Sequence, residues 1–255
     1  MFISANILAK KSDLVICIGT RLSDFTTASK TLFQNQNVKF IGINVSPVDA
    51  IKHSALALVG DAKVSLQKIA EILNLYNYNV DKKYSNEIAS LNSEWHKEVD
   101  RIFSLNNDPC ISQGEVIGLV SKFMNDDDTV VCAAGSLPGD MHKLWRTVNG
   151  DQYHMEYGYS CMGYEIAGGL GIRLAKDNGD VVVMVGDGSF LMMNSEIVTA
   201  LQENIKIIIV LINNHGFGSI NGLSISLGSK GFGNLYRHRD QESGKYTGNE
   251  LPINF

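Results

Sequence analysis

Residues 180–188 read DVVVMVGDG and residues 206–214 read KIIIVLINN, and these two stretches decide the fold. Each begins with a run of β-branched and other apolar residues, which is typical of a strand buried on both faces of a parallel sheet. Each run then stops at small or polar residues, Gly-Asp-Gly at 186–188 and Asn-Asn at 213–214. The pattern predicts two neighbouring parallel strands, each followed by a loop that can carry chemistry.

The segment between the two strands has the features of one crossover helix. Asn194 or Ser195 can cap this helix, and Asn204 is expected to end it. Parallel strands joined by a right-handed crossover end at the same edge of the sheet, where open α/β sheets bind ligands. Asp187 and Asn214 are therefore expected to converge at that edge.

A carboxylate and a carboxamide at one sheet edge predict a site for a hard cation. Oxygen ligands suit Mg²⁺, which keeps some water and takes further ligands from a phosphate. Gly188 and Ser189 lie where a turn or a helix start would offer backbone N–H groups to that phosphate. The alternative is a tight turn in which Asp187 only caps a helix and the asparagines lie in a loop.

The spacing of the two motifs resembles the cofactor signature of thiamine diphosphate (ThDP) enzymes. The surrounding residues are more specific: EYGYSCMGYEIAGGLG at 156–171, GDGSFLMMNSEIVTALQE at 186–203, NNHGFGSINGLS at 213–224 and GFGNLYRHRD at 231–240. They are similar to the branch of this family that opens a cyclic 1,2-diketone in myo-inositol catabolism. The resemblance implies an α/β fold of doubly wound parallel-sheet domains, the cofactors ThDP and Mg²⁺, and hydrolysis of a C–C bond to give 5-deoxyglucuronate.

The resemblance also assigns site residues. Asp187, the side-chain oxygen of Asn214 and the carbonyl of Gly216 match the Mg²⁺ ligands. Met162 matches the apolar residue that holds the cofactor in its bent shape, although a methionine is more often simply part of a core. His215 could face substrate or be an exposed loop residue. The full set assigned to the cofactor is Gly135, Ser136, Met162, Gly186, Asp187, Gly188, Ser189, Asn214 and Gly216.

No catalytic residue is assigned within this chain. Family members carry the glutamate that activates the cofactor in an N-terminal domain, and this sequence resembles an internal fragment without that domain. We therefore expect negligible turnover from these residues alone. The resemblance implies a homodimer or homotetramer for the full-length protein, with a small cyclic diketone as substrate. The alternatives are another ThDP enzyme, such as an acetolactate synthase or a 2-oxo acid decarboxylase, and a non-catalytic α/β binding module.

The chain divides into three predicted parts. Residues 1–75 resemble a partial middle α/β domain, residues 76–110 a linker and connecting helix, and residues 111–255 a C-terminally truncated diphosphate- and Mg²⁺-binding domain. The first part shows two clear strands, within 13–25 and 38–47, which make too small a sheet for a whole domain. The turn Gly19-Thr20 follows the first of these two strands. For this turn we favour a structural role over nucleotide binding.

Several local patterns give further expectations. Ser112 and Glu115 form a capping box for a helix to about Met124. Three consecutive aspartates at 126–128 are expected to form a solvated turn and not a metal site. The segment SLPGD at 136–140 is expected to be a turn before a helix.

Two stripes of residues are assigned to helices. The first, expected to be a packed helix face, comprises Ile88, Leu91, Trp95, Val99 and Ile102. The second is rich in glycine, which weakens a helix, so it indicates either close packing on the sheet or close approach to a cofactor. Its members are Gly163, Ala167, Gly168, Gly169 and Gly171.

Composition excludes several classes of function. The 255 residues are 44% hydrophobic and carry a net charge of −5, so nucleic acid is a poor partner. No apolar stretch is long enough for a membrane span, and the start MFISANILAKK lacks the features of a signal peptide. The four cysteines have no metal-ligand spacing and are expected to be buried free thiols. A soluble cytoplasmic protein is the expectation.

Overall fold

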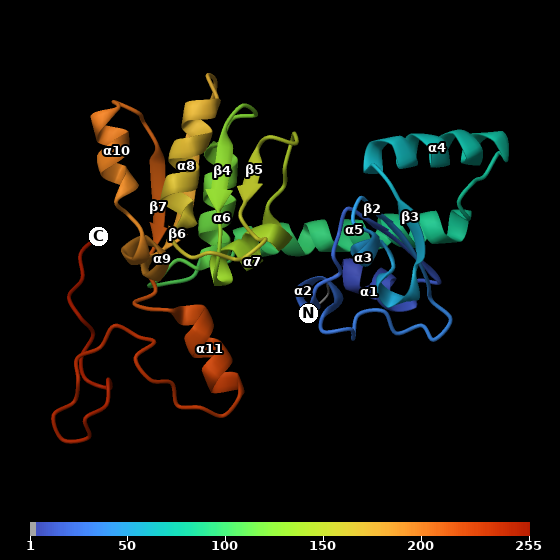
Figure 1. Cartoon of the computed structure of the whole chain (residues 1–255). Helices are drawn as coiled ribbons and strands as arrows, with labels where there is room; N and C mark the ends of the chain where they lie inside the picture. The colour runs from blue at the N-terminus through green and yellow to red at the C-terminus, as the bar shows by residue number, and fades with distance from the viewer. Residues whose placement is uncertain (1–3) are drawn as a thin grey trace. The chain divides into compact units, whose positions relative to one another are not determined.

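The computed structural model describes residues 4–255. Residues 1–3, part of the start judged unlike a signal peptide, lie outside the described residues. The chain forms two compact units, residues 1–100 and residues 101–255. Helix α5 (Lys82–Phe103) begins in the first unit and ends in the second, and it is the connecting helix expected within residues 76–110 (Figure 1).

The first unit is built on a three-stranded parallel sheet in the order β1-β2-β3. Its strands are β1 (Leu14–Ile18), β2 (Lys39–Asn44) and β3 (Leu56–Val59). Only the first two were predicted; β3 is a short apolar run of four residues, all of them exposed. Its helices are α1 (Ser4–Lys11), α2 (Asp24–Thr27), α3 (Pro47–Ala50), the 3-10 turn η1 (Lys52–Ser54) and α4 (Ala62–Leu75).

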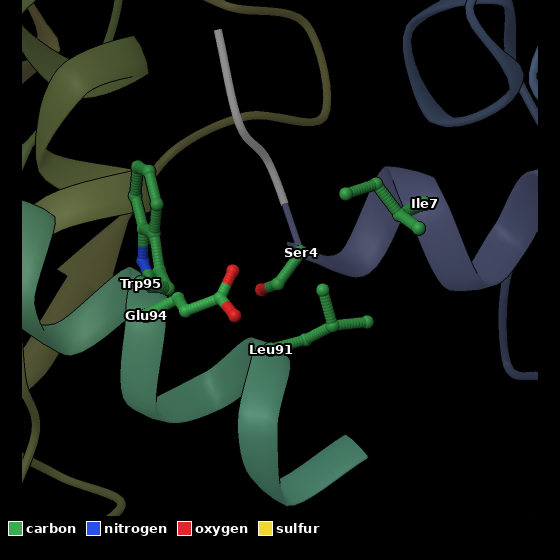
Figure 2. Close-up of a pocket in the computed structure, with 5 residues that line it drawn as sticks. All are labelled: Ser4, Ile7, Leu91, Glu94 and Trp95. Carbon is green, nitrogen blue, oxygen red and sulfur yellow. The ribbon is translucent and has the colours of Figure 1, made fainter. Parts of the chain in front are cut away.

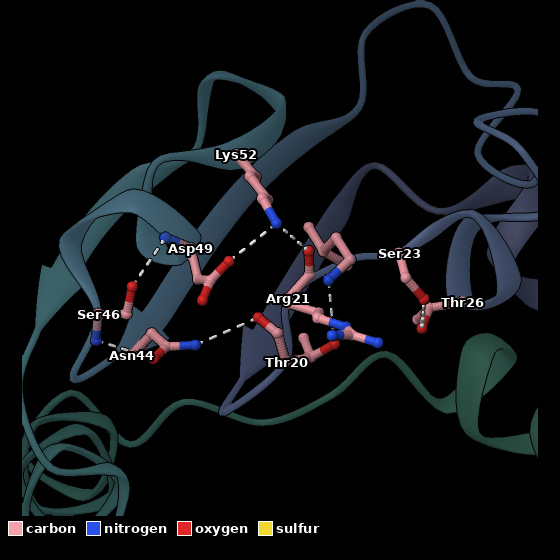
Figure 3. Close-up of polar contacts among 9 residues, drawn as sticks. Thr20, Arg21, Ser23, Thr26, Asn44, Ser46, Asp49 and Lys52 are labelled. Atoms are coloured by element: carbon pink, nitrogen blue, oxygen red, sulfur yellow. Dashed lines mark hydrogen bonds and ion pairs between the residues drawn. The ribbon is translucent and has the colours of Figure 1, made fainter. Parts of the chain in front are cut away.

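Polar groups at the ends of β1 and β2 bind one another (Figure 3). The Asn44 amide donates to the carbonyl of Thr20 at 3.2 Å. Lys52 donates to the carbonyl of Arg21 at 2.6 Å and pairs with Asp49 at 2.8 Å. These contacts join the turn after β1 to the end of β2 and to the segment that follows it.

Helix α5 places its predicted apolar stripe on one packed face. Val99 is 1% exposed, and the other four members of the stripe are partly buried. Leu91 and Trp95 line a shallow pocket with Glu94 and with Ser4 and Ile7 of α1 (Figure 2). This confirms ordinary helix packing for the stripe.

The second unit contains a four-stranded parallel sheet in the order β5-β4-β6-β7. The strands are β4 (Thr129–Cys132), β5 (Tyr153–Met155), β6 (Val181–Gly186) and β7 (Ile208–Ile212). After β4, the chain adds β5 on one side of that strand. It then returns and adds β6 and β7 on the other side of β4. With right-handed crossovers this order is that of a doubly wound sheet, which confirms the predicted fold class.

Six helices accompany this sheet in the described residues: α6 (Gln113–Phe123), α7 (Ser136–Leu144), α8 (Tyr164–Ala175), α9 (Asp187–Met192), α10 (Glu196–Gln202) and α11 (Gly218–Ser226). Helix α8 packs on β4 and β6, and α10 packs beside α8. The core between α8 and the sheet joins Ile166 to four buried valines, Val131, Val181, Val183 and Val185.

The structure corrects several local expectations in this unit. The segment 136–140 is the first turn of α7 and not a separate turn. Its Pro138 is tolerated there because the N–H that proline lacks would have no intrahelical partner in a first turn. The predicted capping box of Ser112 and Glu115 is confirmed. Asp128 is not solvated: it is 6% exposed and accepts the N–H of Asp180 at 2.7 Å.

Cysteine burial was also only partly predicted. Cys17 and Cys132 are buried in strands, as expected, whereas Cys110 and Cys161 are exposed, and all four thiols are free. Both exposed cysteines lie in loops, outside the apolar runs that bury the other two. Throughout residues 4–255, no helix combines the length and the apolar character that crossing a membrane requires.

Candidate functional site

The candidate site lies at the carboxyl ends of β4 and β6. The loop after β4 leads toward β5 and the loop after β6 leads toward β7, so the connections diverge between these adjacent strands. Such a switch point leaves a crevice in which open α/β sheets bind ligands. The turn at Gly135-Ser136 follows β4, and the turn at 186–189 follows β6. The structure therefore places these two sequence-predicted segments at the carboxyl ends of adjacent strands.

Asp187 is a fully buried charged group at this edge. Asp187 directly follows Gly186, which pairs with Ile212 of the neighbouring strand β7. Asp187 is 1% exposed. One carboxylate oxygen accepts the N–H of Gly188 at 2.9 Å and the other accepts the N–H of Gly216 at 2.9 Å. No lysine, arginine or histidine among the described residues pairs with it. A buried carboxylate held only by backbone N–H groups is suited to a cation.

The loop after β7 carries the other two expected metal ligands. Gly216 is buried and has a φ of +151°, and a Cβ there would lie 2.4 Å from the carbonyl oxygen of Asn234. Asn214 is exposed, and its amide lies against Gly218. Within residues 4–255 no hydrogen bond joins Asn214 to Asp187. The structure thus brings Gly216 to Asp187 and leaves the Asn214 amide free to turn toward a ligand.

Ser189, the residue after Gly-Asp-Gly, is 2% exposed and its hydroxyl is fully engaged. It donates to the carboxylate of Glu165, with both oxygens at 2.8 Å. It also accepts the N–H of Gly163 at 2.7 Å. The side chain of Ser189 therefore ties the segment after β6 to the start of α8.

Glu165 is a site residue that the sequence did not single out. It is 1% exposed and accepts the N–H of Gly163 at 3.0 Å in addition to the Ser189 hydroxyl. Burial raises the pKa of Glu165, and hydrogen bonds from its own backbone N–H and from Ser189, Gly163 and Ala134 oppose that rise. Ser189 lies in the first turn of α9, Gly163 is the N-cap of α8 and Ala134 lies between β4 and α7, so one carboxylate joins the segments that follow three strands.

The remaining residues predicted to bind the cofactor are less buried than Asp187 and Ser189. Gly135 is the N-cap of α7 with a φ of +110°, and both it and Ser136 are exposed. Met162 is half-buried in the loop between β5 and α8, directly before Gly163, which has a φ of +92°. A Cβ on Gly163 would lie 2.8 Å from the Cβ of Met193, so this position has no room for a side chain.

The glycines of α8 are explained partly by packing. A Cβ on Gly169 would lie 2.3 Å from the side chain of Val183 in β6. A Cβ on Gly168 would lie 2.4 Å from the ring of Tyr164, whereas Gly171 has no heavy atom within 4 Å. Close approach of helix and sheet therefore accounts for Gly169, and no close contact in the structure requires glycine at 171.

Two buried polar atoms beside this site have no hydrogen-bond partner among the described residues. They are Nδ1 of His215 and the hydroxyl of Tyr236. Tyr236 stacks edge-on against Phe217, and its hydroxyl lies 3.4 Å from where a Cβ of Gly188 would be. His215 is thus half-buried and not simply an exposed loop residue. Unsatisfied donors next to a buried carboxylate fit a site that binds a polar ligand and a cation.

Comparison with protein families agrees with this geometry. The model described as thiamine pyrophosphate enzyme, central domain, matches residues 2–69. The model described as thiamine pyrophosphate enzyme, C-terminal TPP binding domain, matches residues 133–255. The second match spans the switch point, the Gly-Asp-Gly turn and the loop after β7.

Individual relatives were also found. The chain is 43% identical to the 3D-(3,5/4)-trihydroxycyclohexane-1,2-dione hydrolase of Clostridium tetani, 44% to that of Clostridium perfringens and 43% to that of Bacillus thuringiensis. Each match covers 99% of this chain and 42–43% of the relative. The chain thus spans less than half the length of the curated relatives it matches. With both domain models matched in order along it, the chain belongs to the thiamine pyrophosphate enzyme family.

Proposed function

We propose that the full-length protein containing this chain is a ThDP- and Mg²⁺-dependent enzyme that hydrolyses a C–C bond of a cyclic 1,2-diketone in inositol catabolism. The observation that carries the cofactor part is the buried Asp187 carboxylate, which is held by backbone N–H groups and has no cationic partner among the described residues. The substrate part is supported by the names of relatives that are 43–44% identical over 99% of the chain.

Asp187, Asn214 and the carbonyl of Gly216 would hold the Mg²⁺ ion. This set of oxygen donors suits a hard cation, and an ion there would compensate the charge that Asp187 buries. The hydrogen bond from Gly216 N–H to Asp187 brings two of the three groups together before any ion binds.

The cofactor would lie across the switch point. Gly186, Gly188 and the backbone of Ser189 would face its diphosphate from the β6 side, and Gly135 with Ser136 from the β4 side. Met162 would support its bent shape. Bound ThDP supplies an electron sink for breaking a C–C bond next to a carbonyl. The residues of this chain bind and orient the cofactor, and we expect the activating glutamate to lie outside these 255 residues.

The test is an assay of the full-length protein after removal of metal with a chelator. We expect hydrolysis of the cyclic diketone only when both ThDP and Mg²⁺ are restored, and no reaction with pyruvate. Turnover of pyruvate alone would favour an acetolactate synthase or a decarboxylase. An intact protein that binds no ThDP would favour a non-catalytic α/β module. Residues 1–255 assayed alone are expected to show negligible turnover.

We further propose a cytoplasmic homodimer or homotetramer whose partner molecule is the small substrate and not nucleic acid or a membrane. The net charge of −5 supports the absence of a nucleic-acid surface. Sedimentation of the full-length protein measures the number of subunits, and a monomer would contradict this proposal.

A further inference from the structure

The segment 156–163, called here the Met162 loop, joins β5 to α8 and has little packing of its own. Residues 157–161 are all exposed, and Tyr159 is 89% exposed. Exposed loops with few buried contacts open easily unless their backbone is held by other groups. Next to Met162, two carboxylates hold the backbone of this loop.

Glu156 holds the first part of the Met162 loop. One of its carboxylate oxygens accepts the N–H of Tyr159 at 3.0 Å, and the other accepts the N–H of Cys161 at 2.8 Å. These backbone hydrogen bonds hold the pKa of Glu156 below its ordinary range, so the side chain is ionised at neutral pH. The N–H group directly before Met162 is thus fixed by a charged acceptor.

Glu165 holds the far side of the same loop. It accepts the N–H of Gly163 at 3.0 Å, and Ser189 bonds both to this carboxylate and to the same N–H. Because Glu165 is 1% exposed, water competes little for these bonds. The N–H groups on either side of Met162 are therefore each bound by a different carboxylate.

We propose that Glu156 and Glu165 are positioning residues that fix Met162 in place for the cofactor by holding the backbone immediately before and after it. This inference rests on the proposed function, in which Met162 supports bound ThDP. A side chain that must shape a ligand has to be placed before the ligand arrives, since ordering the loop during binding would weaken the affinity. The two carboxylates order the Met162 loop when the protein folds, before the cofactor binds.

Hydrogen exchange of the full-length protein without cofactor tests whether the loop is held. The variants are Glu156→Gln and Glu165→Gln, in which glutamine replaces one acceptor oxygen by a donor of similar size. Exchange within 157–163 is expected to become about 10-fold faster, as expected for losing a charge-assisted bond. The matched control is Glu115→Gln, whose carboxylate accepts N–H groups of Asn107 and Ser112 in another loop. It should speed exchange there and leave 157–163 unchanged.

A double-mutant cycle tests whether the carboxylates act through Met162. The measurement is calorimetric affinity for ThDP in the presence of Mg²⁺, for Glu165→Gln, Met162→Ala and the double variant. We expect Glu165→Gln to weaken binding about 10-fold in the parent protein and less than about 2-fold when Met162 is already alanine, because coupled residues are not additive. A purely structural effect would weaken binding by the same factor in both backgrounds.

The outcomes separate this inference from the proposed function. Unchanged exchange in both glutamate variants, or equal factors in the cycle, would overturn the inference while ThDP binding by the parent protein still supports the function. A parent protein that binds no ThDP would overturn both. Because Glu165 is buried and its variant could misfold, the same cycle with Glu156→Gln, on the exposed loop, gives an independent result.

Discussion

The carboxylate of Asp187 accepts the backbone N–H of Gly216 at 2.9 Å, although the two residues are 29 positions apart. Asp187 follows β6 and Gly216 lies in the loop after the neighbouring strand β7. The bond therefore joins two strand-end loops across the sheet. It connects two residues that we propose to bind Mg²⁺.

Replacing Asp187 by alanine is expected to weaken Mg²⁺-dependent ThDP binding by at least about 100-fold, because removing one partner of a buried charge pair costs about 3 kcal/mol or more. Calorimetry on the full-length protein measures this. The control is Asp180→Asn at the other end of β6, where an ion pair with Lys206 at 2.9 Å is largely exposed. Equal affinity in the Asp187 variant and the parent protein would refute the proposed metal site.

Two glycines of α8 provide a matched pair for stability. Gly169→Ala is expected to lower the free energy of unfolding by about 1–3 kcal/mol, because its Cβ would meet Val183 in the core. Gly171→Ala has free space around it and should raise that free energy by about 0.5–1 kcal/mol through better helix propensity. Denaturant unfolding measures both. Similar effects of the two substitutions would contradict the close packing of α8 on β6.

The capping box of α6 predicts a pH dependence of stability. Hydrogen bonds from the backbone N–H and then the hydroxyl of Ser112 lower the pKa of Glu115 from 4.5 to about 2. A lowered folded-state pKa stabilises the protein above the unfolded value and loses this effect as the pH falls through the folded one. Glu115→Gln should therefore lower Tm at pH 7, with the difference from the parent protein shrinking between pH 4.5 and pH 2. A difference in Tm that stays constant with pH would exclude this explanation.

Tyr236→Phe is expected to leave the cofactor-free protein as stable as the parent or slightly more stable. Its hydroxyl is buried without a partner in the described structure, so removing it costs no hydrogen bond. The control is Tyr164→Phe, because the Tyr164 hydroxyl is paired with His154 at 2.8 Å and its loss should cost about 1 kcal/mol. Thermal unfolding of both variants checks this, and a larger loss in the Tyr236 variant would be the contrary result.

The sheet of the second unit could be predicted because its signal is local. An uninterrupted apolar run such as 181–185 marks a strand buried on both faces, and the residues that follow mark where it ends. The strand β3 was missed although its residues, Leu-Ala-Leu-Val, are apolar, because a run of only four residues is a weak signal for a strand. The first turn of α7 was missed because Gly139 and Pro138 favour a turn in isolation, and only tertiary context makes them helical.

The sequence predicted the site residues that belong to a short motif. It did not predict those whose role depends on contacts between distant segments. Asp187 can be recognised in the sequence because it is a charged residue between two glycines, directly after an apolar strand. Glu165 cannot, because an acidic residue in the first turn of a helix is common and stabilises it anyway. Its partners Ser189 and Ala134 come from other loops, so its role depends on a three-dimensional arrangement that no spacing in the sequence expresses.

The pair of strands β6 and β7 is joined at both ends, and the two ends should respond differently to ionic strength. At one end Asp180 and Lys206 form a direct but largely exposed ion pair at 2.9 Å, and salt weakens exposed pairs more than buried ones. At the other end the Asp187 contact is buried and short, and salt reaches it little. Concentrated salt will therefore loosen the start of this strand pair first, while the crevice at its far end keeps its geometry.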